Sequence, residues 1–221
     1  MNRIEKFGLI IEDYTDMPYF DEIISYFDEH HKDVLDFFKI SSLKNNWVIQ
    51  FLPYDEFKKQ VIRLHGKCES YVRGLTTKEE KMVRALNVED SIKYTTHKDA
   101  DILDICKMII HEYSHACYSE LMPNFLLWFS EGLAQNLANQ DTKIPDISED
   151  DFTIMIKQFN NYSSKSYMYS YCVVKYIFEH YPEEEIYKLT FDRDYLISRT
   201  RDIFDETKVW IKEEYQKREK K

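Results

Sequence analysis

Residues 101–121 read DILDICKMIIHEYSHACYSEL and carry the clearest secondary-structure signal in the chain. Apolar residues recur along this stretch every three or four positions, as they do on one side of an α-helix. Asp101 and Asp104 stand where the cap of a helix N-terminus is expected. The pattern therefore predicts one long amphipathic helix over about residues 101–119.

Sheet signals precede this helix. Trp47–Leu52 is rich in β-branched and aromatic residues, which is typical of a short strand, and Pro53 separates it from a helix predicted over 54–65. Two further strands are predicted at Glu69–Arg73 and Lys81–Leu86, joined by the hairpin connection Gly74–Glu80. We expect a small sheet rather than a barrel.

Helices are predicted over most of the remaining chain. They are an interrupted helix within residues 16–39, a helix over 123–139 with Pro123 in its first turn, a helix from Ser148 to about Phe159, an aromatic helix ending near Tyr181, a helix beginning at Pro182, and a charged tail helix, 208–221, docked by Val209 and Trp210. With only four Gly and five Pro, the chain lacks the turn residues of a many-stranded sandwich. The expected fold class is α+β, predominantly helical, with the small sheet before the helix at 101–119 and a helical C-terminal half.

The length and charge of the chain limit its organisation and its partners. Its 221 residues favour a single domain, with an N-terminal helical segment (1–46), a part with the sheet and the long helix (47–122) and a helical half (123–221). The net charge of −10 argues against nucleic acid or an anionic membrane surface as a partner. No signal peptide or membrane span is recognisable, so a cytoplasmic protein is expected. The oligomeric state cannot be predicted.

One motif within the predicted long helix points to metal chemistry. Residues 111–115 read HEYSH, the H-E-x-x-H pattern. Side chains four residues apart on a helix differ by only about 40° around its axis, so His111 and His115 can bind one Zn²⁺ ion together. Glu112, one step around the helix, can reach the open side of such an ion. The competing interpretation is two ordinary histidines on a half-buried helix face.

A catalytic zinc site takes a third protein ligand and leaves one position for water. The metzincin pattern is excluded, because it needs Gly and His where this chain has Tyr118 and Leu121. Glu120 lies about 140° around the helix from His115 and is expected at the surface. Glu131, within the segment WFSEGLA on the following helix, is the preferred third ligand.

The combination of HEYSH with the downstream segment W-F-S-E-G-L-A (128–134) resembles the gluzincin metallopeptidases, in particular the small peptidase-MA-like proteins. The tyrosine-led segment 167–177 is similar to the helix that follows the zinc-ligand helix in that group. The resemblance covers roughly residues 47–190 and implies a zincin-like fold. It is strong at the two zinc motifs and weak elsewhere.

This resemblance implies roles for individual residues. His111, His115 and Glu131 would bind Zn²⁺, Glu112 would be the general base, and Tyr167 would stabilise the oxyanion, with Tyr171 as the alternative tyrosine. No G-x-M-E-N segment precedes the zinc helix, so aminopeptidase activity is disfavoured. Three polar residues are candidates for orienting the imidazoles, and none of them is assigned: Asp104, Ser114 and Asn136.

The expected activity is a zinc-dependent hydrolysis of peptide bonds in a peptide or protein substrate, with Glu112 taking a proton from the attacking water. The strand predicted at Glu69–Arg73 would pair with an extended substrate. Two alternatives stay open. The first is a catalytically idle zinc-binding module that recognises a protein partner, and the second is a helical interaction protein in which the motif is accidental.

Overall fold

The computed structural model describes residues 1–44, 46–140, 142, 144 and 164–219. The chain divides into two compact units, Met1–Glu120 and Leu121–Lys221, and each is considered by itself. The single domain expected from the sequence stays a prediction. Within the described residues no helix combines the length and the apolar character needed to cross a bilayer.

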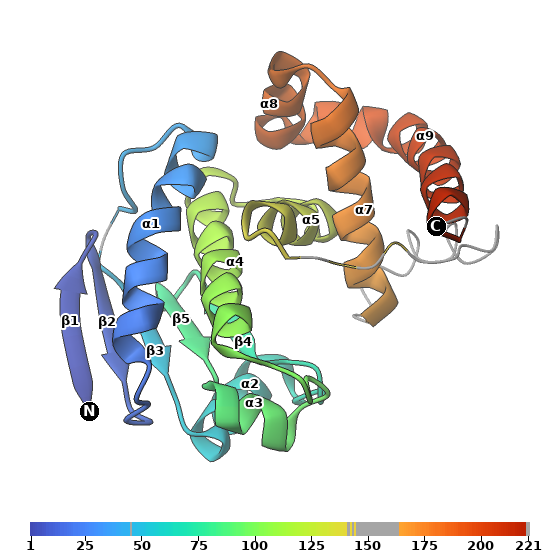
Figure 1. Cartoon of the computed structure of the whole chain (residues 1–221). Coiled ribbons are helices and arrows are strands. Elements are labelled where there is room, and N and C mark those ends of the chain that lie inside the picture. The colour runs from blue at the N-terminus through green and yellow to red at the C-terminus, as the bar shows by residue number, and fades with distance from the viewer. Residues whose placement is uncertain (45, 141, 143, 145–163, 220–221) are drawn as a thin grey trace. The chain divides into compact units, whose positions relative to one another are not determined.

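The described part of the chain is α+β and predominantly helical, as predicted. Its strands are β1 (Asn2–Lys6), β2 (Leu9–Asp13), β3 (Trp47–Phe51), β4 (Gly74–Thr77) and β5 (Met82–Ala85) (Figure 1). Its helices are α1 (Phe20–Phe38), α2 (Tyr54–His65), α3 (Val88–Tyr94), α4 (Ile102–Leu121), α5 (Leu127–Leu137), α7 (Ser164–His180), α8 (Glu183–Phe191) and α9 (Arg193–Glu219). The predicted strand at Trp47–Leu52, the helix over 54–65 and the long helix from residue 101 are all confirmed.

The five strands of the first unit form one mixed sheet in the order β1-β2-β3-β5-β4. β2, β3 and β5 run parallel in the middle, while β1 and β4 are antiparallel to their neighbours at the two edges. Buried and half-buried residues alternate along both β2 and β3. This alternation places one set of their side chains in the core on one face of the sheet.

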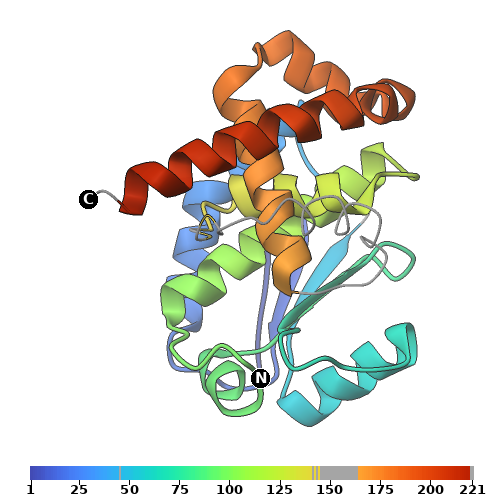
Figure 2. The ribbon, with the colours of Figure 1, turned by 90° about the vertical axis from the view of Figure 1, so that its right-hand side faces the viewer.

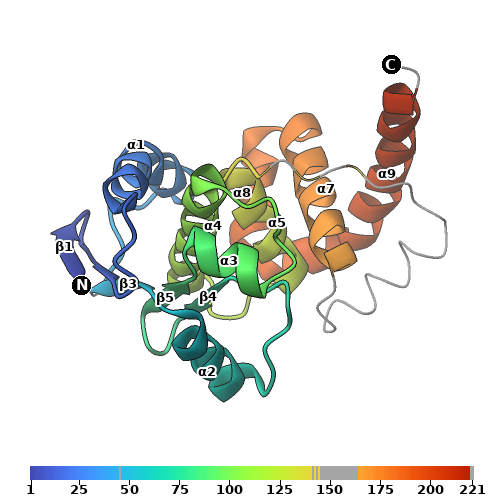
Figure 3. The ribbon, with the colours of Figure 1, turned by 60° about the horizontal axis from the view of Figure 1, so that its bottom comes forward.

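Helices cover the two faces of this sheet differently. Figure 3 shows α1 and α4 on one face and α2 on the other. Aromatic contacts join α1 to α4, with ring centroids 5.0 Å apart for Phe27 and Tyr113 and 5.6 Å apart for Phe38 and Tyr118. The helix that carries the HEYSH motif is therefore fixed in the core of the first unit.

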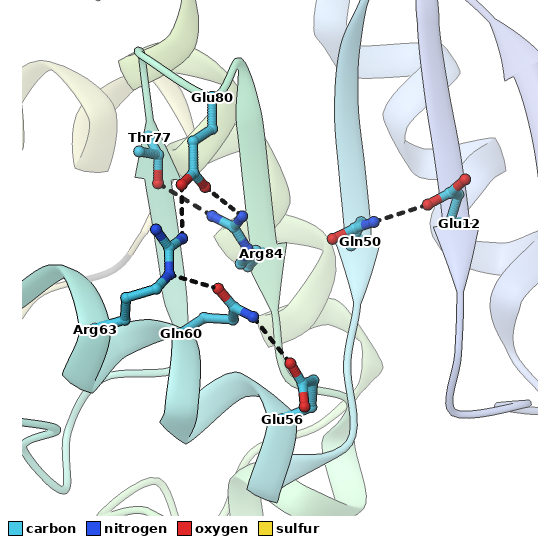
Figure 4. Close-up of polar contacts among 8 residues, drawn as sticks. All are labelled: Glu12, Gln50, Glu56, Gln60, Arg63, Thr77, Glu80 and Arg84. Atoms are coloured by element: carbon cyan, nitrogen blue, oxygen red, sulfur yellow. Dashed lines mark hydrogen bonds and ion pairs between the residues drawn. The ribbon is translucent and has the colours of Figure 1, made fainter.

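A polar network braces the hairpin of β4 and β5 on the α2 side (Figure 4). The carboxylate of Glu80, in the connection between the two strands, accepts hydrogen bonds from Arg84 and from Arg63, the latter at 2.6 Å. Arg84 is buried and also donates to the hydroxyl of Thr77 at 3.2 Å. These contacts hold the edge strand β4 in place from the side opposite α4.

The second unit is helical. α5 lies against α7, and Figure 2 shows the long helix α9 crossing α7. The side-chain amide of Gln135 on α5 donates to the backbone carbonyl of Tyr167 at 2.9 Å, and that of Asn136 donates to the carbonyl of Tyr171 at 3.1 Å. Trp210 on α9 is buried, as predicted for a docking residue.

Three expectations about the N-terminal half are wrong. Residues 2–13, assigned to a helical segment, form the β1–β2 hairpin, whose turn holds Phe7 and Gly8 at positive φ. The helix within 16–39 is continuous from Phe20 to Phe38, since in its polar middle Glu29, Lys32 and Asp33 are exposed while His31 is buried, which continues the amphipathic pattern. The strand expected at Glu69–Arg73 instead occupies Gly74–Thr77, inside the predicted connection.

Two expectations about the C-terminal half are also wrong. The helix predicted to begin at Pro123 begins at Leu127. Val209 is 58 % exposed, so it does not dock the tail helix. The helix expected from Ser148 to Phe159 lies outside the described residues.

Candidate metal centre

The helix α4 begins with a reciprocal cap, as its sequence predicts. The backbone N–H of Asp104 donates to the carboxylate of Asp101 at 2.8 Å, and the N–H of Asp101 donates to the carboxylate of Asp104 at 3.2 Å. Each bond satisfies a backbone donor at the start of the helix. The cap fixes where the helix begins and thus which side chains face the sheet two turns later.

The two histidines of the motif point their ring nitrogens at each other. Nε2 of His111 lies 3.1 Å from Nε2 of His115, and the two ring planes are 84° apart. His111 is buried and His115 is half-buried. Two imidazoles on one tetrahedral zinc ion, each about 2.0 Å from it, have nitrogens about 3.3 Å apart. The distance between the two Nε2 atoms therefore fits a shared ion. The same distance also allows a hydrogen bond between the two rings.

Two other residues of the motif, Tyr113 and Ser114, are buried within the first unit. Tyr113 is buried against α1, and the hydroxyl of Ser114 donates to the backbone carbonyl of Ile110 at 2.8 Å. Two of the residues considered for orienting the imidazoles, Asp104 and Ser114, thus make local helix contacts.

Glu112 faces the edge strand β4. The hydroxyl of Thr76 lies 2.6 Å from Oε2 of Glu112 and 2.9 Å from its backbone carbonyl oxygen. Gly74, two residues earlier on the same strand, lies so close that a Cβ there would stand 2.9 Å from the Glu112 carboxyl carbon. Neither Gly74 nor Thr76 is predicted as a site residue from the sequence.

A positive charge lies near this carboxylate. Arg73 directly precedes β4, and burial lowers the pKa of its guanidinium, while Asp104, Glu112 and Asp101 act in the opposite direction. One of its terminal nitrogens, Nη1, is buried and has no hydrogen-bond partner within the described structure. Because arginine keeps its proton in proteins, Arg73 is a buried cation that interacts electrostatically with Asp104, Glu112 and Asp101.

Glu120, the other carboxylate considered as a ligand on this helix, makes structural contacts instead. Its carboxylate accepts hydrogen bonds from the indole of Trp47 at 2.8 Å and from the backbone N–H of Lys44 at 2.9 Å. It is half-buried and thus only partly at the surface, and its carboxylate anchors the start of β3.

Glu131 lies on α5 of the second unit and is buried. The next residue, Gly132, packs directly on α7, where a Cβ would collide with the backbone of Ser170. The side chain of Asn136, the third residue considered for orienting the imidazoles, is hydrogen-bonded to backbone carbonyls of α5 and α7. The missing side chain of Gly132 therefore allows α5 to pack closely on α7.

His111 and His115 lie on α4 of the first unit, which by itself therefore provides two of the three predicted metal ligands. Glu131 belongs to the second unit, and its role as third ligand stays a prediction. Tyr167 is half-buried and Tyr171 is buried on α7, and a role for either at an oxyanion also stays a prediction.

A comparison of the whole chain with known protein-family models and with curated proteins finds no match.

Proposed function

We propose that this protein is a zinc-dependent metallopeptidase. The observation that carries the proposal is the pair of Nε2 atoms 3.1 Å apart on His111 and His115, with the carboxylate of Glu112 between them in sequence and held against β4. Two imidazoles with one carboxylate, that of Glu131, form a donor set typical of catalytic zinc. The resemblance of HEYSH and WFSEGLA to the gluzincins supports the same proposal.

Each residue has a defined task in this reaction. A Zn²⁺ ion in the site supplies Lewis acidity for water and for the scissile carbonyl. Glu112 accepts a proton from the attacking water and later donates it to the leaving amine. The hydroxyl of Tyr167, or of Tyr171, donates a hydrogen bond to the oxyanion.

The edge strand β4 is the proposed docking strand for an extended peptide. One side of β4 pairs with β5, and among the described strands none pairs with its other side. Free backbone N–H and C=O groups on such an edge bind a peptide by adding a strand. This assigns to Gly74–Thr77 the substrate contact that the sequence assigns to Glu69–Arg73.

The proposal is tested by two variants that separate chemistry from metal binding. Glu112→Gln keeps the size of the side chain but cannot accept the proton, so we expect zinc content near that of the wild type and a loss of hydrolysis by about 10³-fold or more. His115→Ala removes a ligand, so we expect loss of the metal. The control is His65→Ala, an exposed histidine at the end of α2.

The readouts are zinc per chain and cleavage of a peptide library. Unchanged metal content in His115→Ala would remove the ligand assignment. Zinc without turnover in the wild type would favour the idle module that recognises a protein partner, and a chain without zinc would favour an accidental motif. The cytoplasmic location and the absence of nucleic-acid and membrane partners stay predictions.

A further inference from the structure

The hydroxyl of Thr76 has two acceptors within reach and one proton to give. Its Oγ1 lies 2.6 Å from Oε2 of Glu112 and 2.9 Å from the Glu112 backbone carbonyl. A hydroxyl has a single hydrogen, and an ionised carboxylate is a stronger acceptor than an amide carbonyl. With Glu112 ionised, the proton of Thr76 therefore lies on the bond to Oε2.

The second oxygen of the same carboxylate lies over Gly74. Among the atoms closest to a Cβ built on Gly74 are Oε1 of Glu112 and, at 2.8 Å, Sδ of Met108. Residues 74 and 76 project from the same side of a strand, because side chains alternate. On one face of β4, Gly74 therefore leaves room for Oε1 of Glu112, and the hydroxyl of Thr76 is hydrogen-bonded to Oε2.

The neighbouring threonine provides a comparison within the same strand. Thr77 is buried, points to the opposite side of β4 and accepts a hydrogen bond from Arg84 at 3.2 Å. The same strand therefore carries two threonines of the same size, of which only Thr76 contacts Glu112.

We propose that Thr76 is the positioning residue of the general base: its hydroxyl fixes Oε2 of Glu112 and leaves Oε1 as the oxygen that takes the proton of water. This inference rests on the proposed peptidase function. In the ionised state Thr76 donates to Oε2. When Oε1 has taken the proton, Oε2 still accepts from Thr76, so the carboxyl group keeps its orientation until it passes the proton to the leaving amine.

The first experiment compares three single variants of the full-length zinc protein. Thr76→Val keeps the shape of the side chain and removes the hydroxyl, so we expect kcat to fall about tenfold or more, with KM and zinc content unchanged. Thr76→Ser keeps the hydroxyl, and we expect it to stay within about threefold of the wild type. Thr207→Val is the matched control, because Thr207 is a buried threonine on α9 whose hydroxyl donates to the backbone carbonyl of Ile203 at 2.7 Å, and it should leave kcat within about twofold.

The second experiment measures the contact without relying on turnover. In urea unfolding of the full-length chain, Thr76→Val should lower the apparent equilibrium constant for folding about tenfold in the wild type. In a Glu112→Ala background the factor should be clearly smaller, about threefold, because the backbone carbonyl of residue 112 is still there to accept from the hydroxyl. Thr207→Val should cost the same in both backgrounds.

The two experiments separate the possible failures. If the wild type cleaves peptides, Glu112→Gln does not, and Thr76→Val matches the wild type in kcat, the proposed function stands and the role of Thr76 is wrong. If Thr76→Ser loses as much activity as Thr76→Val, the loss of activity does not come from the missing hydroxyl, and the role of Thr76 is again wrong. If the wild type binds zinc and cleaves nothing, the peptidase proposal fails and the role of Thr76 fails with it, whatever the unfolding cycle shows.

Discussion

Replacing Gly74 with alanine tests the contact between β4 and the HEYSH helix at its tightest point. The added Cβ would stand 2.9 Å from the carboxyl carbon of Glu112 and 2.8 Å from Sδ of Met108, whereas ordinary contacts begin at 3.4 Å. The carboxyl group must therefore move by at least 3.4 − 2.9 = 0.5 Å. The side chain of Glu112 is the flexible partner, so it moves before the backbone of the sheet does.

The size of the effect follows from this displacement. A misplacement of about 1 Å at a reacting group costs about 10²-fold in rate, so half of that predicts about tenfold in kcat. Crowding of a packed site costs a further ~1–3 kcal/mol of folding free energy. We therefore expect Gly74→Ala to be both less active and less stable, with zinc still bound by the histidines.

The assay combines steady-state peptide hydrolysis, zinc content and urea unfolding. Gly8→Ala is the control, because Gly8 lies in the β1–β2 turn at a φ of 73° with no atom within 4 Å of an added Cβ. It loses stability through backbone strain alone and should keep wild-type kcat. A Gly74→Ala protein with wild-type kcat would refute the argument that this glycine sets the position of Glu112.

Two further predictions concern stability. Gly132→Ala places a Cβ against the backbone of Ser170, so α5 and α7 must separate, and we expect a loss of about 2–4 kcal/mol in urea unfolding; a loss below 0.5 kcal/mol would contradict this packing. Hydrogen bonds from Arg84 and Arg63 lower the pKa of Glu80 below its ordinary value of 4.5, so the stability they give is present above that value and is lost as the pH falls through the folded pKa. We expect Glu80→Gln to cost about 1 kcal/mol at pH 7 and less at pH 3, and an equal cost at both pH values would contradict it.

The parts of the fold that the sequence predicts well are those whose signals are local. The start of α4 depends on Asp101 and Asp104, three residues apart, and their reciprocal hydrogen bonds form within one helical turn. The pairing of His111 with His115 is equally local, since it follows from the helical repeat alone. Both features can be predicted without knowing where any other helix or strand lies.

The parts that the sequence misses depend on contacts between distant segments. The turn of the first hairpin holds Phe7 at a φ of 60°, a conformation that an aromatic residue rarely takes, so no turn motif marks it. The position of β4 depends on its pairing with β5 and on Thr76 bonding to Glu112, 36 residues further along the chain. Local propensity placed that strand several residues too early.

The four glycines of this chain divide into two kinds, and the division bears on the candidate site. Gly8 and Gly66 have positive φ and are required by the backbone, whereas Gly74 and Gly132 lack a Cβ because another element occupies that space. A glycine of the second kind marks a close approach of two elements. Gly74 meets Glu112 directly, and Gly132 follows the predicted ligand Glu131 in sequence. In a chain with only four glycines, the two that are needed for packing therefore lie next to Glu112 in space and next to Glu131 in sequence, and these are the two carboxylates that the proposed function uses.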